Sequence, residues 1–392
     1  MDAEKQTLKS SITNRILAMK FMSEFILIYP LYTIMFGDRG GVSAAGIGTI
    51  LATGFVLSVV FEVPTGVIGD KIPRKYVLLL AIVSKILALF SWLFLPFYSG
   101  YILGTALFAL GNAFESGALQ AYLYGTLGEE SKKNFGRFWA RVSAMVMLSY
   151  TIAYVLASVI GVKYPLLIIL SILACSGALF ICLSLPKDKL VVLPDGTKPK
   201  IIKSALSHIV QTKMLVKLLL SAVIVVSLAE VVIEYISLYY KQVGVDTRYV
   251  PLLMALGNII GAVLFWTLHS WEKFLDKQKV ILMALMTVLF IASFNRGVAI
   301  ACAGVLIFTR FIRVLQVQFE SNIQHLSNDE ARVTISSIGS FGAKLVAAGI
   351  VVIVGASAIN ESIVQPLRIA LVSGAVVFVV IHSLIRYKQS HI

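Results

Sequence analysis

The stretch EVPTGVIGDKIPRK, from Glu62 to Lys75, ends a long apolar run in a cluster of charge. Up to Gly69 nearly every residue is one that lipid or a packed helix tolerates, and Asp70 is then the first of four charged residues within six positions. Such a boundary is typical of a helix that leaves the hydrocarbon core at a charged membrane face. The stretch therefore predicts a membrane protein.

The composition excludes a soluble protein. Of the 392 residues, 58% are hydrophobic and 14% are charged, and the mean hydropathy is +0.89. Soluble domains have about 25% charged residues. The formal net charge of +14 does not indicate a nucleic-acid partner, because the lysines and arginines lie in short clusters between apolar runs and not on one arm or face.

Apolar runs of membrane-spanning length recur along the whole chain. A spanning helix needs roughly 20 mostly apolar residues, and this criterion gives about twelve helices. The predicted spans are 14–36, 43–69, 76–97, 100–127, 136–160, 164–185, 214–240, 249–271, 277–294, 298–324, 332–356 and 365–387. The predicted fold is an all-α membrane protein with these twelve transmembrane helices.

The segment 186–213 is the one long polar connection and carries six lysines. It divides the chain into an N-terminal six-helix bundle, 1–185, and a C-terminal six-helix bundle, 214–392. Loops rich in lysine and arginine stay in the cytoplasm. We therefore expect this segment and both termini on the cytoplasmic side.

Two short matches between the halves indicate a duplicated unit. SEFILIY, which contains Glu24, matches AEVVIEY, which contains Glu230, in the first helix of each half. The tripeptide FES occurs at 114–116 and again at 319–321, at nearly the same separation. A parallel repeat of two six-helix halves explains both matches.

Ionisable residues deep in the predicted spans are candidates for function. Each costs at least a few kcal/mol in a membrane and is expected to face a cavity or a partner. Burial disfavours the charged form of a carboxylate, and a proton that neutralises it changes what the site attracts. The candidates for proton coupling are Glu24, Glu115, Glu230 and Glu234.

The span 298–324 carries a polar stripe. Arg310 and Arg313 lie three residues apart, and Glu320 continues the same face. Internal ion pairing, for instance between Glu115 and Arg310, is the alternative to substrate contact. The predicted substrate-binding residues are Tyr29, Tyr32, Glu115, Tyr122, Glu230, Glu234, Tyr235, Arg310 and Arg313.

Three lysines also lie within the spans. Lys20 is close to the cytoplasmic end of its helix and is expected to snorkel to the membrane surface. The pattern leaves the roles of Lys85 and Lys344 open.

The sequence has no enzyme signature. HExxH, GxSxG and GxxxxGK[ST] do not occur, and the five histidines lie far apart. Cys175, Cys182 and Cys302 lie inside apolar runs without metal-ligand spacing, so we expect core residues and neither a disulfide nor a metal site. The sequence predicts no enzyme and no cofactor, and any energy input should come from an ion gradient.

The opening stretch resembles the loop signature of the major facilitator superfamily, G-x-x-x-D-R/K-x-G-R-R/K, with Pro73 in place of the second glycine. The matching residues are Gly66, Gly69, Asp70, Lys71, Arg74 and Lys75. EVPTG, SGALQAYLYGTL at 116–127, FGR at 135–137 and RVTISS at 332–337 are similar to a bacterial subgroup of drug and small-molecule exporters.

The resemblance implies alternating access, in which the two halves rock around a midplane site of a monomer in the bacterial cytoplasmic membrane. It also implies that the six matching residues form a cytoplasmic gate, with Asp70 facing the helix N-terminus near Ala331. Two departures leave the direction of transport open. Ala113 stands where many drug antiporters have an arginine, and the span 136–160 lacks their glycine–proline signature.

Two transport hypotheses follow. The first is a proton-coupled exporter of an amphiphilic small molecule, such as an antibiotic, a toxin or a peptide-like compound, with protons and the lipid bilayer as further partners. The second is an importer or uniporter of a polar or anionic metabolite, whose carboxylate or phosphate binds Arg310 and Arg313. A receptor or scaffold is the remaining alternative.

Overall fold

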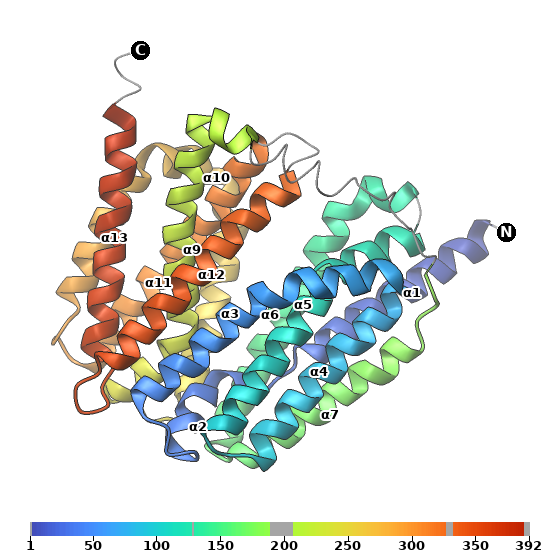
Figure 1. Cartoon of the computed structure of the whole chain (residues 1–392), viewed down its shortest axis with the longest axis horizontal. Helices are drawn as coiled ribbons and strands as arrows, with labels where there is room; N and C mark the ends of the chain where they lie inside the picture. The colour runs from blue at the N-terminus through green and yellow to red at the C-terminus, as the bar shows by residue number, and fades with distance from the viewer. Residues whose placement is uncertain (1, 128, 189–206, 327–331, 388–392) are drawn as a thin grey trace. The chain divides into compact units, whose positions relative to one another are not determined.

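The structure, a computed structural model, describes residues 2–127, 129–188, 207–326 and 332–387, and within them it is almost entirely helical (Figure 1). Nine of the described helices are long and apolar enough to cross a membrane, and Val250–Leu264 is a shorter apolar segment. The prediction of an all-α membrane protein is confirmed.

The first half of the chain follows the predicted spans closely after its first helix. Its elements are α1 (Asp2–Ser23), η1 (Tyr29–Leu31), α2 (Tyr32–Asp38), α3 (Ala44–Lys71), α4 (Arg74–Phe94), α5 (Tyr98–Leu127), α6 (Glu129–Ile160) and α7 (Tyr164–Leu183). The elements of the second half are α9 (Lys213–Gln242), α10 (Val250–Ala292), α11 (Val298–Leu326), α12 (Arg332–Ala356) and α13 (Val364–Tyr387).

The structure differs from the predicted spans in two places. The spans 249–271 and 277–294 belong to one continuous helix, α10, of 43 residues. Residues 272–276 between them read EKFLD and contain no glycine or proline, so nothing interrupts the helical backbone there. Conversely, the predicted helix 14–36 is broken after Ser23 and resumes only at η1.

The chain forms two compact units. One comprises Met1–Val42, Thr53–Leu193 and Asp246–Asn258, and the other comprises Ser43–Ala52, Pro194–Val245 and Ile259–Ile392. Helices α3 and α10 therefore each contribute to both units. The predicted division at 186–213 stays a prediction, since 189–206 lies outside the described residues.

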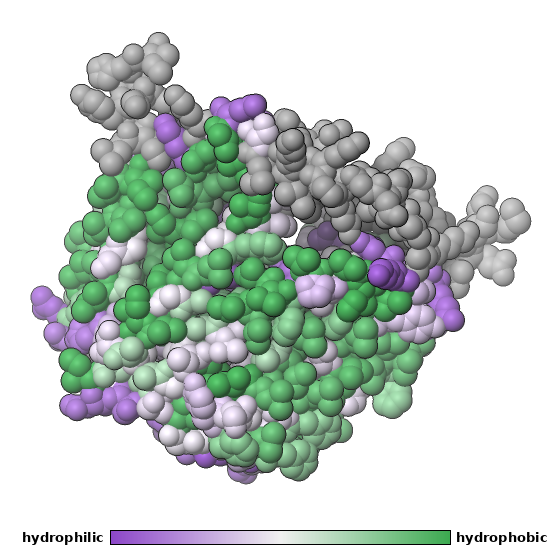
Figure 2. Space-filling view, in the orientation of Figure 1, coloured by the Kyte–Doolittle hydropathy of each residue, from purple (hydrophilic) through white to green (hydrophobic). Residues whose placement is uncertain are grey.

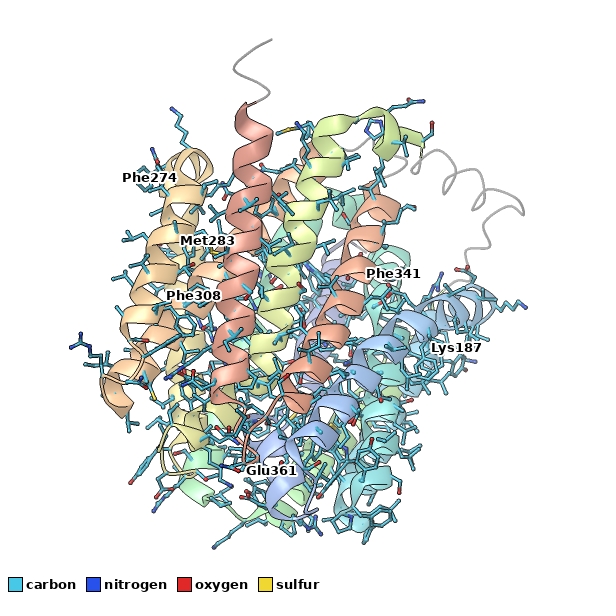
Figure 3. The ribbon with its side chains drawn as sticks, turned by 60° about the vertical axis from the view of Figure 1, so that its left-hand side comes forward. Lys187, Phe274, Met283, Phe308, Phe341 and Glu361 are labelled. Carbon is cyan, nitrogen blue, oxygen red and sulfur yellow. The ribbon has the colours of Figure 1, made fainter. Side chains whose placement is uncertain are left out.

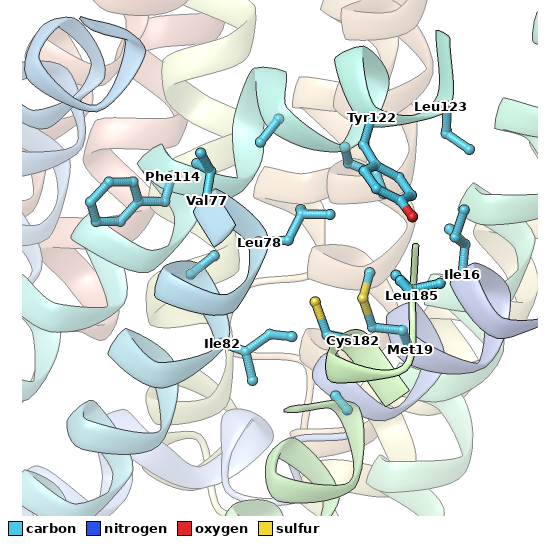
Figure 4. Close-up of a cluster of buried hydrophobic side chains, with 14 of the residues drawn as sticks. Ile16, Met19, Val77, Leu78, Ile82, Phe114, Tyr122, Leu123, Cys182 and Leu185 are labelled. Atoms are coloured by element: carbon cyan, nitrogen blue, oxygen red, sulfur yellow. The ribbon is translucent and has the colours of Figure 1, made fainter. Parts of the chain in front are cut away.

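The core of the first unit is an apolar cluster between α1, α4, α5 and α7 (Figure 4). Ile16, Leu78, Tyr122 and Cys182 are all at most 1% exposed within it. The Tyr122 hydroxyl donates to the Pro186 carbonyl at 2.8 Å. This tyrosine, predicted to bind substrate, thus packs in the core, and the expected burial of the cysteines is confirmed for all three, which are free thiols.

The outward faces of the helices are apolar. Figure 2 shows hydrophobic residues over most of the visible surface. Val159, Leu173, Phe180 and Ile353 are each at least 60% exposed, although each lies in a helix of membrane-spanning length. Exposed apolar side chains on such helices form the surface that lipid covers.

Candidate functional site

Four charged side chains form a closed ring inside the first unit. Lys20 comes from α1, Glu24 from the break that follows it, Lys85 from α4 and Glu115 from α5. The Lys20 ammonium lies 2.7 Å from Glu24 and also pairs with Glu115. The Lys85 ammonium lies 2.9 Å from Glu24 and 2.8 Å from Glu115. Each lysine therefore bridges both carboxylates.

The ring is buried and electrically balanced. The side chain of Lys85 is 1% exposed and that of Glu115, the most accessible member, is 16% exposed. Transfer of one such ion from water costs several kcal/mol, which only close partners of opposite charge offset. The expected snorkelling of Lys20 is wrong, because this lysine finds its partners inside the bundle. The role of Lys85, left open by the sequence, is to complete the ring.

The break in the first helix places Glu24 in the ring. Pro30 has no N–H, so the helical hydrogen-bond pattern cannot continue through it. The backbone groups released there are satisfied by side chains from other helices. The Leu27 N–H donates to the Ser171 hydroxyl at 2.8 Å, and the Ser149 hydroxyl donates to the Phe21 carbonyl at 2.7 Å. Irregular backbone at membrane depth requires such partners.

Close contact between α4 and α5 brings Lys85 to Glu115. A Cβ atom on Gly111 would lie 2.9 Å from the Ala81 carbonyl oxygen and 3.2 Å from Cγ of Lys85. Gly111 precedes Glu115 by one helical turn, so the glycine removes bulk where the lysine crosses. No other residue type fits there without displacing α4.

Aromatic side chains adjoin the ring. The Tyr150 hydroxyl donates to Glu24 Oε2 at 2.6 Å. Its ring centroid lies 6.2 Å from that of Tyr29, which in turn lies 5.6 Å from Phe108. Beyond them, Tyr32 stacks on Trp92 with centroids 5.6 Å apart. We call Tyr29, Tyr32, Trp92, Phe108 and Tyr150 the aromatic wall.

The second unit carries the predicted polar stripe on α11. Arg313 donates to Gln316 at 2.7 Å, and Gln316 donates to Glu320 at 3.1 Å. Arg313 also lies 3.9 Å from Glu230 of α9, with both side chains about 30% exposed. The Arg310 guanidinium passes Gly261 of α10, whose missing Cβ would lie 3.5 Å from it.

Two further predicted site residues lie on α9. Glu234 is half-buried and has no hydrogen bond or ion pair with any residue that the structure describes. Tyr235 is fully buried and donates to the Val351 carbonyl of α12 at 2.8 Å. Among the four acidic candidates, Glu234 is thus the one that forms no hydrogen bond or ion pair with a described residue.

The signature stretch forms a polar joint between α3, α4 and the end of α7. Asp70 and Arg74 pair at 3.1 Å, and the absent side chain of Gly69 leaves room for the guanidinium. The N–H groups of Arg74 and Lys75, which start α4, donate to the Asp188 carboxylate at 2.9 and 3.1 Å. Ala331, the expected partner region of Asp70, lies outside the described residues.

Sequence reasoning missed Tyr150 and Arg368. Tyr150 lies among apolar residues of α6 and has no local signal. Arg368 lies at the start of the predicted span 365–387, where an arginine is ordinary, but it is 4% exposed inside α13. Among the residues that the structure describes, no group of three or more His, Cys, Asp or Glu side chains could hold a metal ion.

Nine described helices of membrane-spanning length, with charged side chains buried among them, define the class of multi-pass membrane proteins. Residues 16–349 match the Major Facilitator Superfamily, and the chain belongs to this superfamily. No curated protein matches the sequence.

Solved transporters share the fold at low sequence identity. The nucleoside transporter NupG has a TM-score of 0.73 and 12% identity, covering 96% of this chain and 99% of its own. A bacterial homolog of the human lysosomal transporter Spinster, inward-facing and unoccupied, has a TM-score of 0.75 and 14% identity, with 95% of each chain covered. A D-xylose–proton symporter has a TM-score of 0.72 and 12% identity, covering 95% of this chain and 97% of its own.

Proposed function

We propose that this protein is a proton-coupled exporter of amphiphilic small molecules, with the ring of Lys20, Glu24, Lys85 and Glu115 as its coupling site. The observation that carries the proposal is that each buried lysine bridges the same two carboxylates beside the aromatic wall. Compounds such as an antibiotic, a toxin or a peptide-like molecule combine a polar group with an apolar body, and they match such a site.

The net charge of the ring is what would couple proton binding to substrate release. With both glutamates ionised, the ring has a net charge of zero. A proton on Glu115, its most accessible member, leaves one unit of positive charge and weakens the hold on both lysines. A cationic group of the substrate and a proton then compete for the same carboxylate, which is the exclusion that antiport requires. Glu234 offers a second proton site in the other unit.

The setting of the protein follows from its charge distribution. We propose a monomer in the bacterial cytoplasmic membrane with both termini and the segment 186–213 in the cytoplasm, which the clustering of lysine and arginine supports. The residues Gly66, Gly69, Asp70, Lys71, Arg74 and Lys75 form its cytoplasmic gate.

Proteoliposomes with an imposed pH gradient test the proposal, using cationic, zwitterionic and anionic compounds in parallel. Glu24→Gln and Glu115→Gln should each lower pH-driven flux at least about tenfold, which corresponds to about 1.4 kcal/mol. Substrate exchange at equal pH should persist, which separates lost coupling from misfolding. Glu320→Gln, on the exposed side of the α11 stripe, is the matched control. Full pH-driven flux in Glu24→Gln and in Glu115→Gln would contradict the proposal, whatever Glu230→Gln and Glu234→Gln do in the same assay.

A second candidate is import or uniport of a polar or anionic metabolite. The wide 3.9 Å separation of Arg313 from Glu230 favours it, because that arginine is only loosely paired and half-buried. A carboxylate or phosphate would then bind Arg310 and Arg313. If Arg310→Gln and Arg313→Gln leave the affinity for anionic substrates unchanged, this candidate fails.

A further inference from the structure

Arg368 is a buried cation without an anion. It lies in the second turn of α13 and is 4% exposed. Its Nε and Nη2 atoms both donate to the hydroxyl oxygen of Tyr239, at 3.1 and 3.0 Å. Within the described residues, no carboxylate pairs with it.

The neighbours of the guanidinium are aromatic. Its central carbon lies 4.2 Å from the ring centroid of Phe294 and 5.6 Å from that of Tyr239. Phe294 continues into a row with Phe290 and Phe308, the last of which is labelled in Figure 3. The cation is therefore held against π-faces and not against a negative side chain.

The cation–π contacts alone do not offset the cost of burying the guanidinium. A desolvated cation–π contact contributes about 2 kcal/mol, whereas a buried ion in a protein costs several kcal/mol. The start of α13 adds a partial positive charge, which disfavours a second one nearby. A negative partner would therefore stabilise the cation in this position further.

Two donors in this region still lack an acceptor. Nη1 of Arg368 has no hydrogen-bond partner among the described residues. The hydroxyl of Tyr239 accepts both arginine bonds, so its own proton is free to be donated, and the described residues provide no acceptor for it either. Neither atom is among the fully enclosed side-chain atoms that lack a partner, so the guanidinium edge and the phenol proton are two donors of one hydrogen-bonded pair that a group from outside can reach.

We propose that Arg368 and Tyr239 form a binding site for an oxyanion, a phosphate or carboxylate group. Planar guanidinium donors match such oxygens in geometry and charge. The oxyanion is either free in solution or the headgroup phosphate of an anionic lipid. The site uses none of the ring residues and does not depend on the proposed transport.

Thermal unfolding of the purified full-length chain tests the site. In neutral detergent, inorganic phosphate is compared with sodium chloride at equal ionic strength; in lipid nanodiscs, phosphatidylglycerol is compared with phosphatidylcholine. The wild type should unfold at a higher temperature with phosphate or with phosphatidylglycerol. Arg368→Gln should lose that increase, and Tyr239→Phe should need about tenfold more phosphate, the equivalent of one hydrogen bond of about 1.4 kcal/mol. The control is Arg296→Gln, which replaces an exposed arginine two residues after Phe294 and should respond like the wild type.

Each outcome decides the proposal. An increase with phosphate identifies a free oxyanion, and an increase only with phosphatidylglycerol identifies a lipid headgroup; both support the site. No increase in the wild type, or an equal increase in Arg368→Gln, overturns it. If Arg368→Gln does not fold, Tyr239→Phe decides, and a response equal to that of the wild type overturns the site.

Discussion

Lys85 of α4 and Glu115 of α5 form an ion pair, with 2.8 Å between Nζ and Oε2, at a point where the lysine side chain is 1% exposed. The same ammonium contacts Glu24, so it holds three separate segments of the first unit together. Its position makes the ring a structural joint of the first unit.

Loss of this lysine should destabilise the first unit. Lys85→Met leaves two buried carboxylates to share one ammonium, and breaking a buried ion pair costs about 3–5 kcal/mol. We expect a lower thermal unfolding temperature in detergent, with partial recovery in the double variant Lys85→Met/Glu115→Gln, whose ring is neutral again. Lys163→Met, at an exposed lysine, is the control. If the double variant is no more stable than Lys85→Met, charge balance is not what the ring provides.

A side chain at position 111 should separate α4 from α5. Gly111→Ala places a methyl group 2.9 Å from the Ala81 carbonyl oxygen, and overpacking of this kind costs about 1–3 kcal/mol. On the same helix, Gly117→Ala meets no atom within 4 Å and should instead be neutral or stabilising. Gly111→Ala should therefore have a lower unfolding temperature and a lower pH-driven flux than Gly117→Ala. Equal values for the two variants would show that α4 and α5 can move apart at Gly111 without loss.

Asp188 should act as the N-terminal cap of α4. Its two oxygens accept from the first two N–H groups of that helix, and loss of a cap costs about 0.5–2 kcal/mol. Asp188→Ala should lower the unfolding temperature, whereas Asp188→Asn keeps one acceptor oxygen and should fall between it and the wild type. Hydrogen exchange at the start of α4 measures this directly. A wild-type exchange rate there in Asp188→Ala would contradict the capping role.

Ser171 should stabilise the broken first helix. Ser171→Ala leaves the buried Leu27 N–H without its acceptor, at a cost of about 1–3 kcal/mol. We expect faster hydrogen exchange and greater protease sensitivity around the break. Ser184→Ala is the control, because that exposed hydroxyl bonds only to a carbonyl of its own helix end. Identical exchange in both variants would show that the break holds without Ser171.

The candidate site was only partly predictable from sequence. Glu24 and Glu115 were identified because a carboxylate inside an apolar run is conspicuous in any position. Their partners were not identified: Lys20 had a local explanation in snorkelling, and Lys85 had none. Arg368 lies so near the start of its apolar run that it resembles a loop residue, and only its contact with Tyr239 reveals a buried cation.

The sequence alone determined the membrane class, most helix boundaries and the superfamily signature from Gly66 to Lys75, because these depend on local composition and spacing. Which helix faces meet was decided only by the tertiary structure. Membrane helices are apolar on nearly every side, so hydrophobic pattern does not specify their neighbours. Packing at Gly111 and the break before Pro30 brought Glu24, Lys85 and Glu115 to one point.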